Sequence, residues 1–576
     1  MDAKVKYQEW LENPYFDQGT KEELESIKDN EKEIKERFYK NLEFGTAGLR
    51  GIIGAGTNRI NQYTVRKATQ GLANYIKKSN STKRSVAIAY DSRRFSKEFA
   101  TETALCLAAN GIKAYIFESL RSTPELSFAL RTLNCIAGVN ITASHNPPEY
   151  NGYKVYWEDG AQITPPHDGG IMEEVAKIED YTTLKTTTVS QAEKDGLIEV
   201  IGKEVDDAYI KVLKEQVIHL DAIRQTQQDL KIVYSPLHGT GNIPVRRVLK
   251  ELGFENVYVV KEQELPDGEF STVAYPNPEA DETFELGLKL AKEIDADLVI
   301  ATDPDADRLG VRVKDKEGIY HTLTGNMSGA LLADYIIGQR QRLKGLPKDG
   351  YMVKTIVTSN LIDSIADYYK VELVQVLTGF KYIGQKILES ELTGVGEYLF
   401  GLEESYGCLI GTYARDKDAI SAAMSLCEAA AYYKTKGMTL WDAMVDLYKR
   451  CGYHYDEVMS IELKGIEGIA KIGEILSTLR ETPPSYVGNQ KVERIRDYQS
   501  GRIINLITGE ETETLLPSSN VLFYDLEGRS WFCVRPSGTE PKIKLYYGVL
   551  GDSLEVSKEK SQVLGLEIQK MIKKML

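Results

Sequence analysis

Short β-rich runs alternate with helical stretches three times along the first 440 residues, and this alternation constrains the fold more than any other feature. The β-rich runs lie at 86–90, 113–117 and 136–141, then at 231–234, 256–260 and 297–301, and then at 351–358, 371–377 and 398–402. Strands that alternate with helices in this way indicate parallel, doubly wound sheets. The pattern therefore predicts three similar α/β domains in succession.

The order changes beyond about residue 440, where strands follow one another with few helices between them. The expected strands are 492–496, 503–507, 521–524, 531–534 and 542–549, and a helix over 554–575 closes the chain. This order predicts a C-terminal α+β domain. A length of 576 residues also favours about four domains. We expect their boundaries at 1–204, 205–317, 318–440 and 441–576, arranged around a central cleft.

The charge and the cysteines restrict the class of protein. With 85 acidic residues against 71 Lys and Arg, the net charge is −14. This balance argues against non-specific binding to nucleic acid or to an anionic membrane. The six cysteines form no CxxC pair, which is typical of reduced, buried thiols. The first residues lack an apolar signal region and no run of ~18 apolar residues occurs. We therefore expect a soluble cytoplasmic protein.

Ligands of α/β sheets bind beyond the carboxyl ends of the strands, so the polar loops at those positions are the candidate sites. The first loop is Thr-Ala-Ser-His-Asn-Pro, at 142–147. Adjacent side chains of an extended segment point to opposite sides, so His145 should be poorly placed to deprotonate Ser144. No Gly-x-Ser-x-Gly elbow is present. A plain polar turn and a serine displayed for covalent phosphoryl chemistry both stay open.

The second loop is Asp-Pro-Asp-Ala-Asp-Arg, at 303–308. Three carboxylates at alternate positions can face one point, where they repel one another unless a cation is bound, and hard oxygen ligands suit Mg²⁺. An EF-hand is excluded, because Arg308 and Lys314 stand where Gly and Glu are needed. A haloacid-dehalogenase-type phosphatase with Asp303 as nucleophile competes, although Asp307 in place of Thr or Val favours a ligand trio. A solvated acidic loop is the third interpretation.

Two further loops offer groups for binding a sugar phosphate. In the segment 401–407, Glu403 and Ser405 stand at alternate positions and can hydrogen-bond sugar hydroxyls. In the segment 535–541, Arg535 supplies a bidentate cation and the following small residues supply hydroxyls and a free backbone, as in a phosphate cradle. A simple turn is the alternative for each loop.

Together, these four loops in this order resemble the α-D-phosphohexomutase superfamily. The resemblance extends from Phe44 to the end of the chain, and the strings at 142–147 and 535–541 are specific in combination. Further matches lie at 45–50, 151–154 and 378–381, the last of which is most similar to the phosphoglucomutase and phosphopentomutase branch. Pro304 is a departure, since much of the superfamily has Gly there, but it leaves the three carboxylates in place.

The resemblance implies an intramolecular phosphotransferase that works through a phosphoserine. The implied catalytic residues are Ser144, Arg50, Lys154 and His145. One Mg²⁺ per chain is implied, held by the Ser144 phosphate, Asp303, Asp305 and Asp307, with glucose 1,6-bisphosphate as priming activator. The implied substrate-binding residues are Arg308, Thr378, Lys381, Glu403, Ser405, Lys417, Arg535, Ser537, Gly538 and Thr539.

The resemblance favours interconversion of α-D-glucose 1-phosphate and D-glucose 6-phosphate. Phosphomannomutase or phosphopentomutase activity on the same scaffold is the alternative, and a non-catalytic sugar-phosphate-binding protein is another class. Arg50, Lys154 and Lys417 are candidates for proton transfer and equally for plain anion binding. We expect sugar phosphates as ligands, no nucleic-acid or membrane partner, and a monomer or weak homodimer.

Overall fold

The structure is a computed structural model that describes residues 2–42, 48–79, 81–463, 465–536 and 542–576. The described chain forms two compact units. The first contains Met1–Gly325, Phe380–Tyr398 and Ser405–Leu440, and the second contains Asn326–Gly379, Leu399–Glu404 and Trp441–Leu576.

The first unit begins with three short helices, each started by a side-chain cap. Asp2 caps α1 (Ala3–Glu12), Asp17 caps α2 (Gln18–Ser26) and Asn30 caps α3 (Glu31–Phe38), because each side chain accepts a hydrogen bond from a free N–H of the first turn. The helices pack through an aromatic cluster in which Trp10 stacks on Phe16. This cluster anchors the N-terminal segment to the rest of the first unit.

The first sheet carries its strands in the order β1-β5-β4-β2-β3-β6. Its strands are β1 (Leu49–Ile52), β2 (Ser85–Tyr90), β3 (Lys113–Phe117), β4 (Ala137–Ile141), β5 (Tyr150–Trp157) and β6 (Ile198–Ile201). Strands β4, β2 and β3 are parallel, as the sequence pattern predicts, and the unpredicted strand β6 is parallel to β3. Strand β5 is antiparallel to β4 and to β1, so it folds back on β4 as a hairpin that the pattern did not predict.

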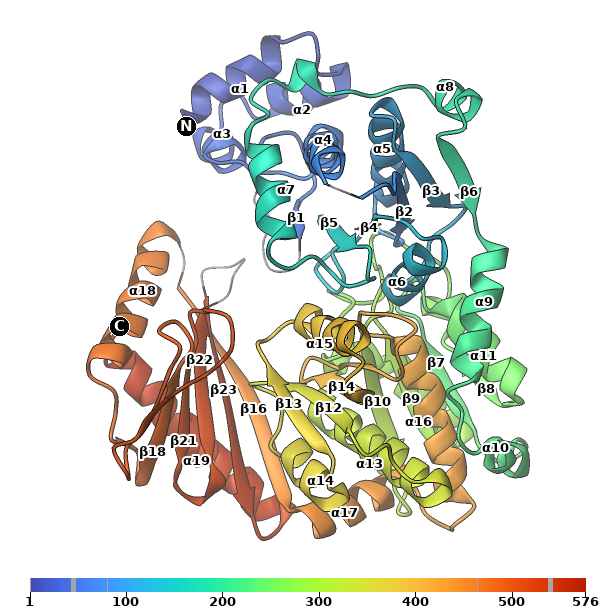
Figure 1. Cartoon of the computed structure of the whole chain (residues 1–576), viewed down its shortest axis with the longest axis vertical. Helices are drawn as coiled ribbons and strands as arrows, with labels where there is room; N and C mark the ends of the chain where they lie inside the picture. The colour runs from blue at the N-terminus through green and yellow to red at the C-terminus, as the bar shows by residue number, and fades with distance from the viewer. Residues whose placement is uncertain (1, 43–47, 80, 464, 537–541) are drawn as a thin grey trace. The chain divides into compact units, whose positions relative to one another are not determined.

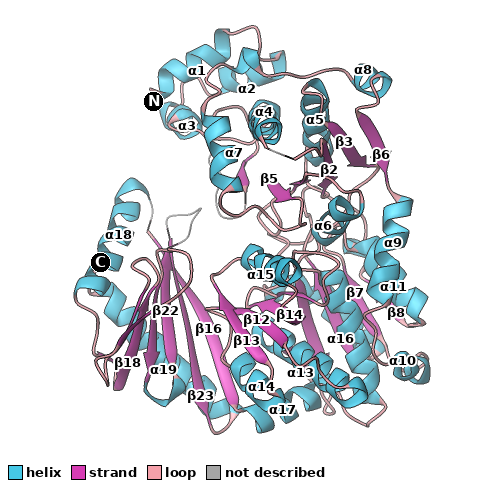
Figure 2. Ribbon diagram, viewed as in Figure 1, coloured by secondary structure: helices cyan, strands magenta, loops and turns pink. Residues whose placement is uncertain are grey.

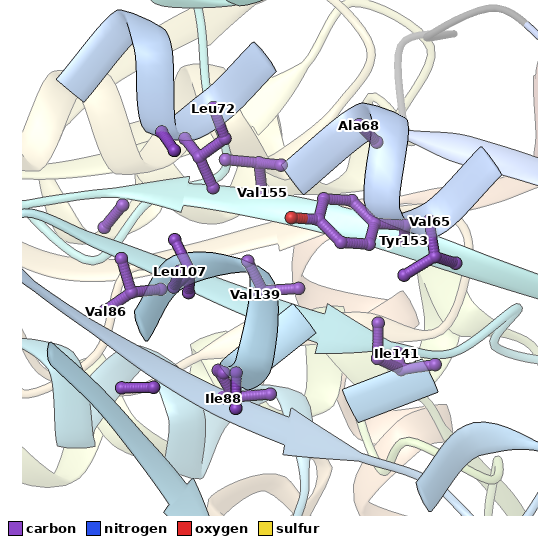
Figure 3. Packing of buried hydrophobic residues seen from close by; sticks show 14 of the residues in the cluster. Val65, Ala68, Leu72, Val86, Ile88, Leu107, Val139, Ile141, Tyr153 and Val155 are labelled. Atoms are coloured by element: carbon purple, nitrogen blue, oxygen red, sulfur yellow. The ribbon is translucent and has the colours of Figure 1, made fainter. Parts of the chain in front are cut away.

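Helices cover both faces of this sheet. The helices of this region are α4 (Gln62–Lys78), α5 (Ser96–Ala109), α6 (Thr123–Thr132) and α7 (His167–Ala176). Figure 1 shows α4 and α5 on one side of the strands and α6 on the other. Val139 packs with Leu72 of α4 and Leu107 of α5 (Figure 3), whereas the neighbouring Gly138 faces Leu130 of α6. This alternation is what a strand between two helical layers requires.

The second sheet repeats this plan with the order β11-β10-β9-β7-β8. Its strands are β7 (Ile232–Ser235), β8 (Val257–Val259), β9 (Leu298–Thr302), β10 (Leu309–Lys314) and β11 (Tyr320–Leu323), and the helices of this region are α9 (Lys203–Lys214), α10 (Leu220–Thr226), α11 (Asn242–Leu252), α12 (Glu285–Ile294) and α16 (Ala419–Lys434). Helix α8 (Val189–Lys194) contacts α5 and β6 of the first sheet, and α15 (Phe380–Thr393) also belongs to the first unit. Strands β8, β7 and β9 are parallel, but β10 returns antiparallel to β9. The predicted serine and aspartate loops are therefore hairpin connections rather than strand-to-helix crossovers.

The second unit contains most of the third sheet and the C-terminal sheet. In the third sheet, β12 (Gly350–Thr355) lies between β13 (Glu372–Val376) and β14 (Glu397–Glu403), and β12 is parallel to β13. The helices of this region are α13 (Gly325–Lys344), α14 (Leu361–Tyr369) and α17 (Leu440–Cys451), and β15 (Gly407–Leu409) follows β14 in the chain. The predicted third α/β block is thereby confirmed.

The C-terminal sheet has the order β16-β23-β22-β21-β18-β19-β20, and β17 pairs with β18. Its strands are β16 (Tyr453–Glu462), β17 (Tyr486–Val487), β18 (Gln490–Asp497), β19 (Arg502–Asn505), β20 (Glu511–Glu513), β21 (Leu522–Leu526), β22 (Trp531–Pro536) and β23 (Lys542–Gly551), with helices α18 (Gly465–Glu481) and α19 (Leu554–Lys573). The paired strands are antiparallel and run side by side in Figure 2. The predicted α+β domain is confirmed, although β16, β17, β20 and α18 were not foreseen.

The structure also bears on two features of the composition, the cysteines and the apolar segments. All six cysteines are buried and free. Among the described helices, none combines the length and the apolar character that a membrane span needs.

The packing of the first sheet predicts a stability difference between two isoleucines. Ile88 on β2 is fully buried, whereas Ile243 on α11 is 70% exposed. Ile88→Ala should lower the free energy of unfolding by about 2–5 kcal/mol, because it removes buried methyl groups and leaves a cavity. Ile243→Ala should change it by about 0.5 kcal/mol or less. Urea unfolding followed by circular dichroism measures both variants, and equal shifts of the transition would contradict this packing.

Candidate functional site

Ser144 stands on a sharply turned loop between β4 and β5. Its backbone φ of +52° lies in the left-handed region, and its side chain is almost fully buried. The Ser144 amide donates a hydrogen bond of 2.8 Å to Oγ1 of Thr142, and that hydroxyl donates one of 2.6 Å to Oδ2 of Asp91. Two consecutive hydrogen bonds therefore tie the turn at Ser144, through Thr142, to Asp91 at the end of β2.

The guanidinium of Arg93 holds the same loop from the inside. It donates to the carbonyl oxygens of Ser144 (2.6 Å), Asn146, Pro147 (2.8 Å) and Tyr150 (3.1 Å). Burial lowers the pKa of Arg93 to about 10, which leaves the group charged at neutral pH. Because one rigid cation bonds four carbonyls of the same loop, it holds that loop in a single defined shape.

The Ser144 hydroxyl points at the aspartate loop. Its Oγ donates a hydrogen bond of 2.8 Å to Oδ2 of Asp303, and it lies 3.1 Å from Nδ1 of His145. The expectation that His145 is poorly placed toward Ser144 is wrong, because the left-handed turn at Ser144 brings the two neighbouring side chains together. Burial, with Arg308 and Arg50 nearby, holds the pKa of His145 well below its usual range, so its imidazole is neutral.

The aspartate loop brings its three carboxylates to one point. Ligand oxygens of Asp303, Asp305 and Asp307 all lie within 4.8 Å of one another, and all three residues are buried. Oδ1 of Asp303 accepts 3.0 Å hydrogen bonds from the amides of Asp307 and Arg308, and Ala306 turns the chain with a φ of +52°. The prediction that the three side chains face one point is confirmed, although the loop is a turn and not an extended segment.

The close approach of the three carboxylates shifts the pKa values of Asp303 and Asp305 in opposite directions. Burial, together with the charges of Asp305 and Asp307, raises the pKa of Asp303 well above its usual range. For Asp305, burial acts in the same direction, but the charge and the hydrogen bond of Lys154 outweigh it and lower the pKa. Three close carboxylates cannot all ionise without a positive partner.

Basic side chains surround the acidic cluster. Nζ of Lys154 lies 2.7 Å from Oδ2 of Asp305 and 3.6 Å from Oδ2 of Asp307, and Nζ of Lys417 lies 3.2 Å from that second oxygen. Arg308 donates to Glu279 at 2.6 Å, and Arg50 donates to Oδ1 of Asn146 at 2.9 Å. The sequence-predicted residues of the first two loops and these cations therefore form one cluster within the first unit.

The oxygens of the cluster fit a hard divalent cation. Oδ1 of Asp305 and Oδ1 of Asp307 are buried and accept no hydrogen bond from the residues that the structure describes. Buried carboxylate oxygens without donors are costly unless a cation takes the place of the donor. An all-oxygen ligand set of this kind suits Mg²⁺.

The predicted sugar-binding loop lies at the end of β14. Glu403 is buried and accepts a 2.9 Å hydrogen bond from the amide of Gly379, whose φ of +123° favours glycine. The segment 401–407 is extended only as far as Glu403, because residues 404–406 form a turn. The expectation that Ser405 lies on the same face of an extended segment as Glu403 therefore does not hold. Oγ1 of Thr378 is buried and has no hydrogen-bond partner among the described residues.

Other predicted positions have fewer described contacts. In the first unit, Nζ of Lys381 lies 3.5 Å from the carbonyl of Ile163 and 4.0 Å from Asp168, and burial lowers its pKa. Arg535 is the fifth residue of β22. Burial raises the pKa of the Tyr546 phenol, and the positive charge of Arg535 offsets part of that rise. Ser537, Gly538 and Thr539 lie outside the described residues, as do residues 45–47.

Several supporting residues were missed from the sequence. Asp91 and Arg93 follow directly after β2, so the rule that ligands bind beyond strand ends was a usable signal for them. Thr123 and Asn140 are buried polar residues that contact the aspartate loop or one another. Thr123 is 182 positions from its partner Asp305, and no local pattern shows that pairing.

Comparison with known proteins identifies the chain's relatives. Residues 41–182, 207–318 and 324–451 match the profiles of α/β/α domains I, II and III of phosphoglucomutase/phosphomannomutase. A Staphylococcus epidermidis protein named phosphoglucomutase is 40% identical over 529 residues, which cover 92% of this chain and 94% of that protein. A Staphylococcus aureus protein of the same name is 38% identical over 514 residues, covering 89% and 90%.

Two solved structures share the fold. The open form of parafusin, a Paramecium phosphoprotein called a phosphoglucomutase, superposes with a TM-score of 0.69 at 19% identity and covers 93% of this chain and 96% of its own. A Burkholderia thailandensis phosphoglucomutase/phosphomannomutase family protein gives 0.64 at 18% identity, with 91% and 97% covered. At these identities, the likeness concerns the fold alone.

The buried contacts of Arg93 with the loop at 144–150 predict different losses of stability for substitutions at two adjacent arginines. Arg93→Met removes four carbonyl contacts and leaves Asp91 buried without its cation, so the free energy of unfolding should fall by about 3–5 kcal/mol. Arg94→Met removes an exposed ion pair to Glu269 and one exposed 3.4 Å hydrogen bond to the Pro148 carbonyl, and should cost about 1 kcal/mol or less.

Denaturant unfolding measures both variants, and hydrogen–deuterium exchange of residues 142–150 should accelerate in Arg93→Met alone. Equal exchange in the two variants would show that Arg93 does not hold the loop.

Proposed function

We propose that this chain, which belongs to the phosphoglucomutase/phosphomannomutase family, interconverts α-D-glucose 1-phosphate and D-glucose 6-phosphate. The single observation that carries the proposal is the buried Ser144 hydroxyl, held 2.8 Å from an aspartate of the acidic cluster. Relatives named phosphoglucomutase, 38–40% identical over about nine-tenths of the chain, support glucose as the sugar.

In the proposed reaction, the enzyme carries a phosphoryl group on Oγ of Ser144. The bond between this oxygen and phosphorus breaks while the 6-hydroxyl of glucose 1-phosphate forms a new bond to phosphorus and loses its proton. The products are glucose 1,6-bisphosphate and the free Ser144 hydroxyl. His145 Nδ1, at 3.1 Å, and Asp303 Oδ2, at 2.8 Å, hydrogen-bond that hydroxyl in the structure.

The second half-reaction runs in reverse on the other phosphate. After the bisphosphate reorients, the phosphoryl group at carbon 1 passes to Oγ of Ser144, whose proton leaves, and glucose 6-phosphate is released. The neutral imidazole of His145, whose Nδ1 lies 3.1 Å from this oxygen, is a competent acceptor for the proton. Catalytic amounts of glucose 1,6-bisphosphate would phosphorylate any unloaded enzyme.

Asp303, Asp305 and Asp307, with an oxygen of the Ser144 phosphate, are the proposed ligands of one Mg²⁺. When bound, this ion neutralises negative charge that builds up on the phosphoryl group during transfer. The two carboxylate oxygens without hydrogen bonds, one on Asp305 and one on Asp307, support this assignment. Arg50 and Lys154 supply further positive charge, either for the phosphate or for proton transfer.

The substrate is proposed to be held by its hydroxyls and by its second phosphate. A carboxylate accepts from two neighbouring hydroxyls and a serine hydroxyl donates or accepts, so both tolerate a sugar that binds in two orientations. We assign this role to Glu403 and Ser405, and phosphate binding to Arg535, Ser537, Gly538 and Thr539. Arg308, Thr378, Lys381 and Lys417 complete the proposed set.

The proposal is tested by a substrate panel and a serine variant. With glucose 1,6-bisphosphate as primer and Mg²⁺ present, kcat/KM should be highest for glucose 1-phosphate among the glucose, mannose and ribose 1-phosphates. Ser144→Ala should lower turnover at least about 10³-fold, because its methyl group cannot accept a phosphoryl group.

Ser557→Ala is the matched control, since it removes a buried hydroxyl from α19. A higher kcat/KM for mannose or ribose 1-phosphate would select the alternative activity. Near-normal turnover of Ser144→Ala would end the covalent-serine mechanism.

The sugar-binding assignment makes a separate prediction. Glu403→Gln should leave a substrate hydroxyl poorly paired, which costs roughly 1–3 kcal/mol of binding. We therefore expect kcat/KM for glucose 1-phosphate to fall at least about tenfold, while phosphorylation of Ser144 persists. Glu397→Gln, at the exposed start of the same strand, serves as control. If discrimination between glucose 1-phosphate and ribose 1-phosphate stays unchanged in Glu403→Gln, sugar selection lies elsewhere.

A further inference from the structure

Thr123 links the start of α6 to the aspartate loop through two hydrogen bonds. Its backbone amide donates to the carbonyl oxygen of Asp305 at 2.9 Å, and its Oγ1 donates to Oδ2 of the same residue at 2.9 Å. The amide is free to do so, because the first N–H groups of a helix have no acceptor within the helix. Thr123 is fully buried, so no solvent competes for either bond.

A second buried residue sets the direction of the hydroxyl proton. Nδ2 of Asn140, on β4, donates a 2.7 Å hydrogen bond to Oγ1 of Thr123. An ionised carboxylate can only accept, so the one proton of the Thr123 hydroxyl must point at Asp305, and the Asn140 amide fills a lone pair behind it. The hydroxyl is thereby committed as a donor to Asp305.

This arrangement separates the two oxygens of the Asp305 carboxylate. Oδ2 receives hydrogen bonds from Thr123 and from Lys154 at 2.7 Å, whereas Oδ1 receives none from the described residues. Two donors from different directions fix the plane of the carboxylate. Of the two, Thr123 is short and β-branched, with few rotamers, while Lys154 is long and adaptable.

We propose that Thr123 is a positioning residue for metal binding: it holds Asp305 by Oδ2 so that Oδ1 faces the divalent cation. The inference rests on the proposed Mg²⁺ ligands and adds a residue that does not itself touch the ion. Partners that orient a ligand in this way commonly change metal affinity by about 10–100-fold when they are removed.

The test measures Mg²⁺ binding to the unphosphorylated full-length protein by titration calorimetry, without substrate. Thr123→Val keeps the shape of the side chain and removes the donor, so its Kd for Mg²⁺ should rise about tenfold or more. Thr123→Ser keeps the donor and should bind nearly as wild type. Asp305→Asn removes the charge of the proposed ligand itself, so it shows how far the Kd for Mg²⁺ rises when a ligand is lost.

The matched control is Thr103→Val, which removes another fully buried threonine hydroxyl, bonded to the Phe99 carbonyl within α5. Its Kd should not change. If the melting temperature of Thr123→Val falls well below that of this control, Thr123→Ala takes its place, with the same expected rise in Kd.

Two outcomes overturn the inference while leaving the proposed activity intact. One is a wild-type Kd in the folded variant that lacks the hydroxyl, and the other is a Kd in Thr123→Ser as high as in Thr123→Val. Absence of Mg²⁺ binding by the wild type would instead remove the proposed metal site, and this role of Thr123 with it.

Discussion

Three buried carboxylates held within reach of one another are the constraint on which the rest of this structure depends. Asp303, Asp305 and Asp307 repel one another, and burial makes that repulsion stronger than it is in water. Lys154 and Lys417 offset part of this repulsion, and backbone amides donate hydrogen bonds to Asp303. Two carboxylate oxygens still accept no hydrogen bond from the residues that the structure describes. The cluster therefore fits a cation, and the proposed phosphoryl carrier, the Ser144 hydroxyl, lies beside it.

The fold makes this arrangement possible through two hairpins. The serine loop joins β4 to β5 and the aspartate loop joins β9 to β10, so both loops are short and held at each end by paired strands. Arg93 then fixes the serine loop from within, and Thr123 ties the start of α6 to Asp305. The groups that the proposed phosphoryl transfer brings together are thus placed by paired strands and a helix, which limits the reorganisation that such a transfer requires.

Local patterns in the sequence were sufficient for the three α/β blocks, for the C-terminal α+β domain and for the aspartate trio, because each rests on short-range periodicity or spacing. Antiparallel β5 and β10 escaped prediction, since nothing local distinguishes a hairpin return from a crossover after the loop. The contact between Ser144 and His145 depends on one left-handed residue, and Thr123 depends on a partner in another domain. Such contacts arise from tertiary structure, and no periodic pattern in the sequence indicates them.

The most direct test of this account is the position of the phosphate on the enzyme. Wild-type protein incubated with glucose 1,6-bisphosphate and Mg²⁺ is digested, and tandem mass spectrometry locates the modified residue. We expect phosphoserine at Ser144, whose hydroxyl is held beside the acidic cluster. Phosphate on Asp303, or none on Ser144 while the enzyme turns over, would contradict it.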